Sequence, residues 1–347
     1  MFQMGQPLIG RSAWRPRDFK SREDYTVELS AAQLAGLDAA LAAGRRGAPV
    51  TEGMTARHFA LGALAPDVAA WRDEVLHGRG FLVLRGLSRA RYSDDDLAGI
   101  FWGLGTHLGR AVSQSPMGDR IGHVTDVGSR DRRERAYRSS RELTLHTDRC
   151  DVIGMLCLQP AARGGVSGYA SAHTVYNDLL EERPALLGPL FRGFRYHRRA
   201  EQQPGEPPIT PQRVPVLSAA SGDLSVVFLR AYIEMAAQEL GEPLTAEDVT
   251  ALDAFEETAR RPEVELDFTL EAGELIFFNN CVLLHTRTAF EDDPAAAAKR
   301  HLLRLWLMLD GRRPLDPAVH AYKGTRGIVA QGARSTYYTG GAMPGRY

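Results

Sequence analysis

The sequence predicts a mainly β protein, either a β-sandwich or a jelly roll, with helices packed around it. Short apolar segments bounded by glycine or polar residues dominate the middle and the end of the chain, and such segments are typical of buried strands. Helical patterns are concentrated near the N-terminus and around residues 233–260. This distribution does not match the regular strand–helix alternation of a doubly wound sheet, so it favours packed β-sheets.

Three helices and one strand are expected in the first third of the chain. The helices cover Ser30–Ala43, Ala65–His77 and Ser93–Leu108. Pro66 lies near the start of the second helix, where its missing N–H is not needed, and Ser93 or Asp94 is expected to cap the third. The apolar run within Gly78–Gly86 has glycines on both sides and predicts a buried strand.

Short strands and two more helices are expected in the rest of the chain. The strands are Val152–Leu158, Gly168–His173, Leu224–Leu229, Val264–Leu270, Glu274–Phe278 and Leu302–Leu309. Gly168–His173 is expected to pair with Val152–Leu158. The helices are Val175–Glu182 and Thr245–Arg260, the latter capped by Thr245. The proline-rich segment Pro204–Pro211 predicts a loop.

The domain organisation predicted for residues 1–347 is a single domain with three additions. These are an N-terminal helical extension (about 1–65), a helical insert (about 175–260) and a polar C-terminal segment (about 311–347). The charge run Arg130–Arg135 predicts a solvated loop. Tyr337–Gly341 is interpreted either as a lid with an aromatic wall or as a frayed tail.

Composition excludes several function classes. The chain of 347 residues has a net charge of -1, with 44% hydrophobic and 24% charged residues, which argues against a nucleic-acid binder that relies on a basic face. The sequence shows no apolar leader and no run of roughly 18 apolar residues, so no membrane segment is expected. Three scattered cysteines without a CxxC pair predict free thiols and a cytoplasmic protein. The expected partner is a small-molecule substrate, and a homo-oligomer is possible.

Three residues form a possible metal site. His146 and Asp148 are two residues apart, so in an extended segment both side chains point the same way. His285 ends a distant apolar run. Each feature alone is typical of an ordinary structural or surface residue. Together they make a 2-His-1-carboxylate set, which leaves one face of an octahedral Fe(II) ion open to a chelating cosubstrate and O₂.

Two arginines follow the second histidine. Arg300 and Arg304 share a strand face with the apolar Leu302, and buried arginines require anionic partners. A guanidinium binds a carboxylate through two hydrogen bonds. Arg300 would bind the distal carboxylate of a dicarboxylic cosubstrate, and Arg304 would bind that group or an acidic group of the substrate. Two salt-bridged surface arginines are the alternative.

The order of these motifs resembles a known enzyme family. HTD, then GELIFFNNCVLLHTRTAF, then KRHLLRLWL is similar to the TauD/TfdA family of Fe(II)- and 2-oxoglutarate-dependent dioxygenases. GRGFLVLRG and RGGVS also resemble segments of that family, and the resemblance covers about residues 65–310. It implies a double-stranded β-helix (jelly-roll) core, iron ligands at His146, Asp148 and His285, and 2-oxoglutarate bound by Arg300.

The resemblance implies further roles near the metal. Ser167 stands where the family usually has threonine, so its hydroxyl is expected to contact the same 2-oxoglutarate carboxylate, although Val166 replaces the usual aspartate. Arg304 stands where some members bind an anionic substrate group. Asn280 matches a family asparagine with a structural role. Weaker candidates for substrate contact are Arg149, Tyr232 and Gln114.

The implied activity is hydroxylation of an aliphatic C–H bond in a small, acidic or amino-acid-like substrate. Fe(2+), 2-oxoglutarate and O₂ are required, and 2-oxoglutarate is converted to succinate and CO₂. Related halogenases lack the carboxylate ligand, whereas this chain keeps Asp148. Alternatives are a desaturase or cyclase of natural-product biosynthesis, and a catalytically idle protein that binds the metal and 2-oxoglutarate. An idle relative is expected to lack a ligand or the anchoring arginine.

Overall fold

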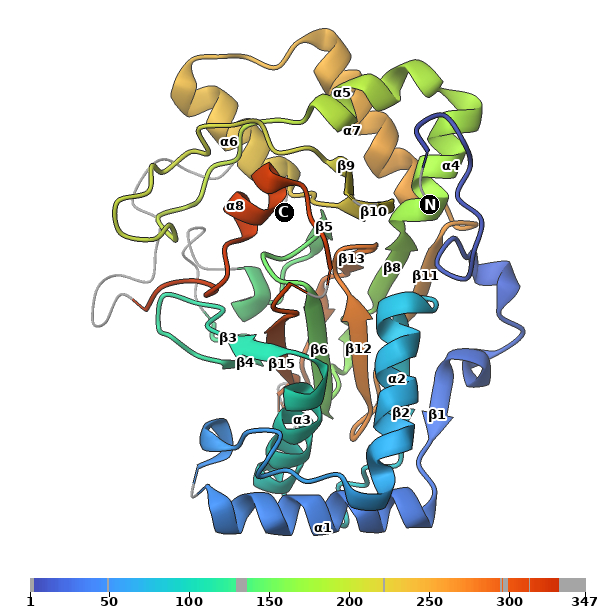
Figure 1. Cartoon of the computed structure of the whole chain (residues 1–347), viewed down its shortest axis with the longest axis vertical. Coiled ribbons are helices and arrows are strands. Elements are labelled where there is room, and N and C mark those ends of the chain that lie inside the picture. Colours follow the sequence, from blue (N-terminus) through green and yellow to red (C-terminus); the bar gives the residue numbers. More distant parts are fainter. Residues whose placement is uncertain are drawn as a thin grey trace.

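The computed structural model describes residues 3–48, 50–128, 136–220, 222–293, 295, 299–311 and 313–330. Two β-sheets lie at the centre of the molecule (Figure 1). The larger sheet has the order β1-β2-β12-β6-β15-β3, with β4 also paired to β15, and the smaller has the order β11-β8-β13-β5. The predicted mainly β fold with flanking helices is therefore confirmed.

The strands of the larger sheet are β1 (Thr26–Glu28), β2 (Phe81–Arg85), β3 (Arg110–Val112), β4 (Ile121–Val124), β6 (Val152–Gln159), β12 (Leu275–Asn279) and β15 (His301–Met308). Those of the smaller sheet are β5 (Leu143–His146), β8 (Ser167–Ser171), β11 (Glu265–Phe268) and β13 (Leu283–Arg287). Two short hairpins pair β9 (Leu217–Ala220) with β10 (Asp223–Val226) and β7 (Arg163–Gly164) with β14 (Phe290–Glu291).

Strand β15 contributes to two apolar cores through the alternation of its side chains. Leu302 and Trp306 belong to an apolar cluster that also contains Tyr169 and Phe268 of the smaller sheet. The intervening Leu303 and its neighbours on the same face belong to a second cluster, shared with the helices. Since successive side chains of a strand point to opposite faces, one strand contributes to both cores.

Helices α2 (Ala65–His77) and α3 (Asp94–Leu108) cover the outer face of the larger sheet, and α1 (Ala31–Gly47) packs against α3 at the end of the molecule (Figure 1). Their starts follow from capping and proline chemistry. Ser30 and Ser93 accept hydrogen bonds from backbone N–H groups three residues on, and Pro66 lies in the first turn of α2. These helices were all expected from the sequence.

A second group of helices lies at the other end of the molecule (Figure 1). It contains α4 (Ala172–Glu182), α5 (Leu187–Arg192), α6 (Arg230–Leu240) and α7 (Ala246–Ala259), which share an apolar cluster with the β9–β10 hairpin. Helix α4 begins three residues earlier than expected, because the Ser171 side chain accepts a hydrogen bond from Thr174 N. Strand β10 is shorter than expected and ends at Val226.

One predicted strand pairing is wrong. Residues 167–171 form β8, which pairs with β11 and β13, whereas β6 lies between β12 and β15 in the other sheet. Gly164 and Gly165, both with positive φ, lie in the connection between β6 and β8. Alternation identifies a strand but not its partner, so this transfer between sheets could not be read from the local pattern.

Other differences concern the two ends. Residues 26–28, within the segment expected to be helical, add the parallel strand β1 to the larger sheet. The polar segment after Gly311 contains helix α8 (Pro317–Lys323). Arg130–Arg135 and Tyr337–Gly341 lie outside the described residues. Among the helices of the described part, each is too short or too polar to cross a bilayer.

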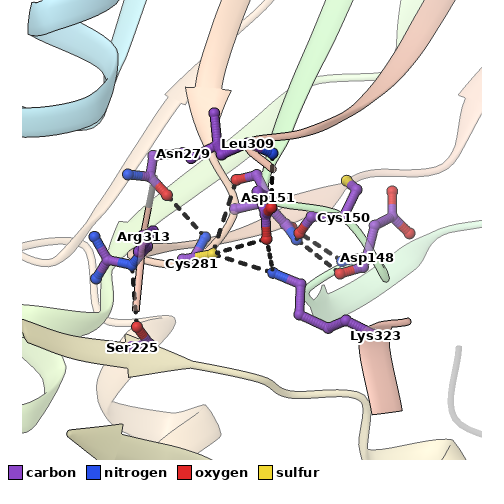
Figure 2. Close-up of polar contacts among 10 residues, drawn as sticks. Asp148, Cys150, Asp151, Ser225, Asn279, Cys281, Leu309, Arg313 and Lys323 are labelled. Atoms are coloured by element: carbon purple, nitrogen blue, oxygen red, sulfur yellow. Dashed lines mark hydrogen bonds and ion pairs between the residues drawn. The ribbon is translucent and has the colours of Figure 1, made fainter. Parts of the chain in front are cut away.

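A buried ion pair attaches α8 to the larger sheet (Figure 2). Lys323 Nζ lies 2.8 Å from Asp151 Oδ1 and 3.1 Å from Cys281 Sγ, and the other Asp151 oxygen accepts a hydrogen bond from Leu309 N. Burial alone would lower the pKa of Lys323, which is 1% exposed, but Cys281 and Asp151 raise it above its ordinary value. The lysine therefore stays charged, and its position depends on the carboxylate.

We predict that Lys323→Met destabilises the protein by about 3–5 kcal/mol, because Asp151 is left buried without its cation. The free energy of unfolding in urea measures the loss. Arg110→Met is the control, since the exposed Arg110–Asp310 pair is expected to contribute about 0–1 kcal/mol. Equal losses in the two variants would contradict the structural role of the buried pair.

A second prediction concerns packing between α3 and β6. A Cβ atom at Gly154 would lie 2.7 Å from Phe277 and 2.8 Å from Phe101, whose rings stack at 5.8 Å. Gly154→Ala should therefore cost about 1–3 kcal/mol in unfolding free energy. Gly188→Ala, at a helical glycine with no neighbour within 4 Å, should instead stabilise by about 0.5–1 kcal/mol. A stabilising Gly154→Ala would refute this packing.

Candidate metal centre

Two neighbouring strands bring the predicted metal ligands together. His146 ends β5 and lies directly opposite His285 of β13 in the antiparallel register, with ring centroids 4.1 Å apart. Asp148 follows two residues after His146. One ligand atom from each of these three residues lies within 4.8 Å of the others. The structure thus forms the 2-His-1-carboxylate cluster that the sequence suggested.

The chemistry of this cluster fits a divalent metal ion. Burial lowers the pKa of His146, and burial together with the adjacent His146 lowers the pKa of His285 well below its ordinary value. Both imidazoles are therefore neutral at neutral pH, as metal ligands must be. Nδ1 of His285 is buried without a hydrogen-bond partner among the described residues. Two neutral imidazoles and one carboxylate match the ligand set of non-heme Fe(II) oxygenases.

Hydrogen bonds orient the candidate ligands. Trp306 Nε1 donates to Asp148 Oδ2 at 2.9 Å, and Nδ1 of His146 lies 2.7 Å from the carbonyl oxygen of Thr144. Asn280 accepts from Asp148 N and donates to the carbonyl oxygens of Asp148 and Cys150. Such contacts restrict ligand orientation in metal sites. Sequence reasoning did not single out Trp306, although its position two residues after Arg304 places it on the same strand face.

The predicted cosubstrate residues lie between the two sheets. Arg300, 4% exposed, has its Cζ atom 4.8 Å from the Phe290 ring centroid, and its Nη1 has no hydrogen-bond partner among the described residues. Ser167 is the first residue of β8, and Tyr169, two residues later, lies on the same strand face. A buried guanidinium near hydroxyl groups fits the carboxylate of 2-oxoglutarate.

Arg287 is a further cation of this region that sequence reasoning did not assign. Its Cζ atom lies 5.0 Å from the same Phe290 ring, and Nη2 donates to the Ser139 carbonyl oxygen. Burial, followed by the positive charge of Arg300, lowers the pKa of Arg287 to about 9. The only sequence signal was its place two residues after His285, on the same strand face. Two mutually repelling cations strengthen the case for an anion between the sheets.

A pocket opens beside the triad. Of its lining residues, the sequence predicted His146, Asp148, Arg149, Tyr232 and Arg304, and it did not single out Tyr137, Leu143, Thr144, Thr147, Arg199, Glu201, Leu229, Ala231 and Trp306. The arrangement places a mixed polar and aromatic cavity next to the candidate metal. Such a cavity suits a small molecule with a few polar groups.

Arg304 and Gln114 contact each other rather than acting as two separate pocket residues. Arg304 Nε donates to Gln114 Oε1 at 2.6 Å, and Nη1 lies 3.4 Å from Asp148 Oδ2. Gln114 Nε2 in turn donates to the Arg304 carbonyl oxygen, and Gln114 does not line the pocket. Much of the Arg304 guanidinium is thus occupied by protein groups.

Comparisons with known proteins agree with this geometry. Residues 46–306 match the family described as "Taurine catabolism dioxygenase TauD, TfdA family". FR-33289 synthase of Streptomyces rubellomurinus is 31% identical over 92% of this chain and 95% of its own length. The taurine hydroxylase-like protein SAT17 of Stachybotrys chartarum is 30% identical over 87% of this chain and 80% of its own length.

Solved structures show the same fold. An asparagine oxygenase complex with Fe(II), 3-hydroxyasparagine and succinate has a TM-score of 0.61 and 20% identity, covering 82% of this chain and 93% of that one. The non-heme iron oxygenase OrfP with Fe, succinate and hydroxyarginine has a TM-score of 0.62 and 18% identity, covering 87% and 99%. The chain therefore belongs to the TauD/TfdA family of Fe(II)- and 2-oxoglutarate-dependent dioxygenases.

Proposed function

We propose that this dioxygenase hydroxylates an aliphatic C–H bond of a small acidic or amino-acid-like molecule. The observation that carries the proposal is the pocket lined by His146 and Asp148, two of the three residues of the His146–Asp148–His285 cluster. Two fold relatives were solved with hydroxylated amino acids, hydroxyasparagine and hydroxyarginine, which supports an amino-acid-like substrate. We also propose a cytoplasmic location, supported by three free, buried cysteines.

The proposed mechanism assigns separate tasks to separate residues. His146, Asp148 and His285 would hold Fe(II), which, when bound, supplies the site where 2-oxoglutarate and O₂ react to give succinate, CO₂ and an oxidant for the substrate. Arg300 would bind the far carboxylate of 2-oxoglutarate, and Ser167 would add a hydroxyl contact. Because Arg300 is buried, this ion pair would be shielded from water.

Three side chains would keep the carboxylate ligand in place. Trp306 and Arg304 contact Asp148 Oδ2, and Asn280 fixes the backbone on both sides of it. Restricting the carboxylate in this way limits the directions from which it can bind a metal. The pocket residues would then orient the substrate C–H bond toward the open face of the cluster.

A mass-spectrometric substrate screen tests the reaction. With Fe(II), ascorbate and 2-oxoglutarate present, we expect an acidic or amino-acid-like compound to gain one oxygen atom while succinate forms. Loss of two hydrogens would instead identify a desaturase or cyclase. Absence of succinate with every compound would favour an idle binding protein, although the chain retains all three ligands and Arg300.

We predict that Trp306→Phe lowers the affinity for Fe(II) by about 10- to 100-fold, because Asp148 loses the N–H group that orients it. Anaerobic Fe(II) titration measures this change, and Asp148→Ala, which removes the ligand itself, should abolish turnover. Trp102→Phe is a matched control, since the Trp102 indole donates to Met54 O, outside the pocket. Full activity of Asp148→Ala would refute the ligand set.

We predict that Arg300→Leu raises the KM for 2-oxoglutarate by about 30-fold or more, since losing one partner of a buried charge pair costs about 2–5 kcal/mol. Steady-state kinetics with varied 2-oxoglutarate measures it. Arg163→Leu, at an exposed arginine paired with Glu291, is the control and should leave this KM unchanged. If only Arg304→Leu raised the KM, the assignment of the two arginines would be reversed.

A further inference from the structure

Arg149 is a buried cation whose role the mechanism leaves open. It follows Asp148 directly, is 7% exposed and lines the pocket. Its Nε and Nη1 are buried and have no hydrogen-bond partner in the part of the chain that the structure describes. Its Cζ atom lies 5.4 Å from the ring centroid of Tyr322 in α8. A ring face attracts the charge but accepts no conventional hydrogen bond, so the N–H groups still require an acceptor.

Arg304, the other candidate for binding an anionic substrate group, has fewer N–H groups without a partner. Its Nε and Nη1 contact Gln114 and Asp148, and its Cζ atom lies 4.4 Å from the Tyr137 ring and 5.1 Å from the Trp306 ring. Only Nη2 of Arg304 is without a partner among the described residues. Arg149, Arg199 and Arg304 all line the pocket, and Arg149 has a larger unmet demand for acceptors than Arg304.

A strained turn adds to the same wall of the pocket. Arg199 and Ala200 have φ values of 54° and 58°, a left-handed conformation that is strained for non-glycine residues. Arg199 N donates to His197 Nδ1, and Glu201 N donates to the Arg198 carbonyl oxygen. Arg199 and Glu201 both line the pocket. Such strain is typical of segments that present side chains to a ligand.

From these observations we propose that Arg149 is the residue that recognises the substrate, by binding an oxyanionic group of carboxylate, sulfonate or phosphate type. The proposal rests on the proposed function and narrows its substrate class. The anion site is distinct from that of 2-oxoglutarate, because neither Arg300 nor Arg287 lines this pocket. Asp148 and Glu201 line the pocket as well, so the cavity is not positively charged throughout.

The geometry also predicts how strongly variants with different residues at position 149 bind the anion. A planar guanidinium can lie against the Tyr322 ring while its edge donates several hydrogen bonds to an oxyanion. A lysine would keep the charge but lose the fixed fork of donors. Arg149→Lys should therefore bind the anion more weakly than the parent protein and more tightly than Arg149→Gln.

Oxyanion binding in the absence of turnover tests the proposal. The protein is loaded with Ni(II) and saturating 2-oxoglutarate, so that the Arg300 region is filled, and is titrated with acetate, methanesulfonate, phosphate and the neutral acetamide. Calorimetry gives Kd, and the thermal midpoint gives a second readout. We expect at least one oxyanion to bind and acetamide not to bind. Comparing the three anions identifies the type of group.

Variants separate Arg149 from general charge effects. Arg149→Gln should raise the Kd of the preferred oxyanion by about 30-fold or more. Arg91→Gln is the matched control, because the Arg91 guanidinium also lies 5.4 Å from a tyrosine ring but outside the pocket; its Kd should stay within about twofold. If Arg149→Gln does not fold, Arg149→Lys replaces it, with an intermediate Kd expected.

Three outcomes would overturn the inference. These are no oxyanion binding to the parent protein, equal binding by the Arg149 variants, or loss of binding only in Arg304→Gln. The substrate screen keeps the two proposals apart. If only a neutral compound were hydroxylated, the proposed hydroxylase activity would stand and the Arg149 anion site would be refuted. If an oxyanion bound but no compound gained oxygen, the Arg149 anion site would stand and the proposed hydroxylase activity would be refuted.

Discussion

The pairing of β5 with β13 is the constraint on which the active centre depends. Their register places His146 directly opposite His285, across more than a hundred residues of sequence. A shift of one residue would turn one of the two imidazoles to the other face of the sheet. Asp148 lies beyond the end of β5, where pairing no longer fixes it, and Asn280 and Trp306 take over that task. The geometry of the candidate ligands therefore follows from strand register at two positions and from side-chain hydrogen bonds at the third.

The same space between the sheets contains both an apolar core and concentrated charge. Leu302 and Trp306 pack against the smaller sheet, while Arg304, on the same strand face, is buried next to them. Arg287 and Arg300 flank the Phe290 ring and disfavour each other's charge. Burying these positive charges without anions costs free energy. A bound anionic cosubstrate would lower this cost and so stabilise the folded protein.

Local features and the candidate ligand set were predictable from the sequence, whereas the other long-range contacts were not. Capping residues and apolar spacing identified α1, α2, α3 and α7 closely, and the order of HTD, His285 and the two arginines indicated the ligand set. The transfer of β8 to the smaller sheet was missed, because alternation does not encode a partner. The contact of Trp306 with Asp148 and that of Lys323 with Asp151 each join residues far apart in sequence. The local sequence around Trp306 or Lys323 does not predict such a contact.

The attachment of α8 has a consequence for the order in which the protein is made. Asp151 is buried three residues beyond Asp148, yet its cation, Lys323, is synthesised more than 170 residues later. Tyr322, which lies beside Arg149, arrives at the same moment. While the chain is still being translated, the strands that carry the two histidines can already be present, but this carboxylate lacks its partner. Completion of the centre is thus tied to the last helix described here, so an unfinished chain on the ribosome would hold an immature pocket.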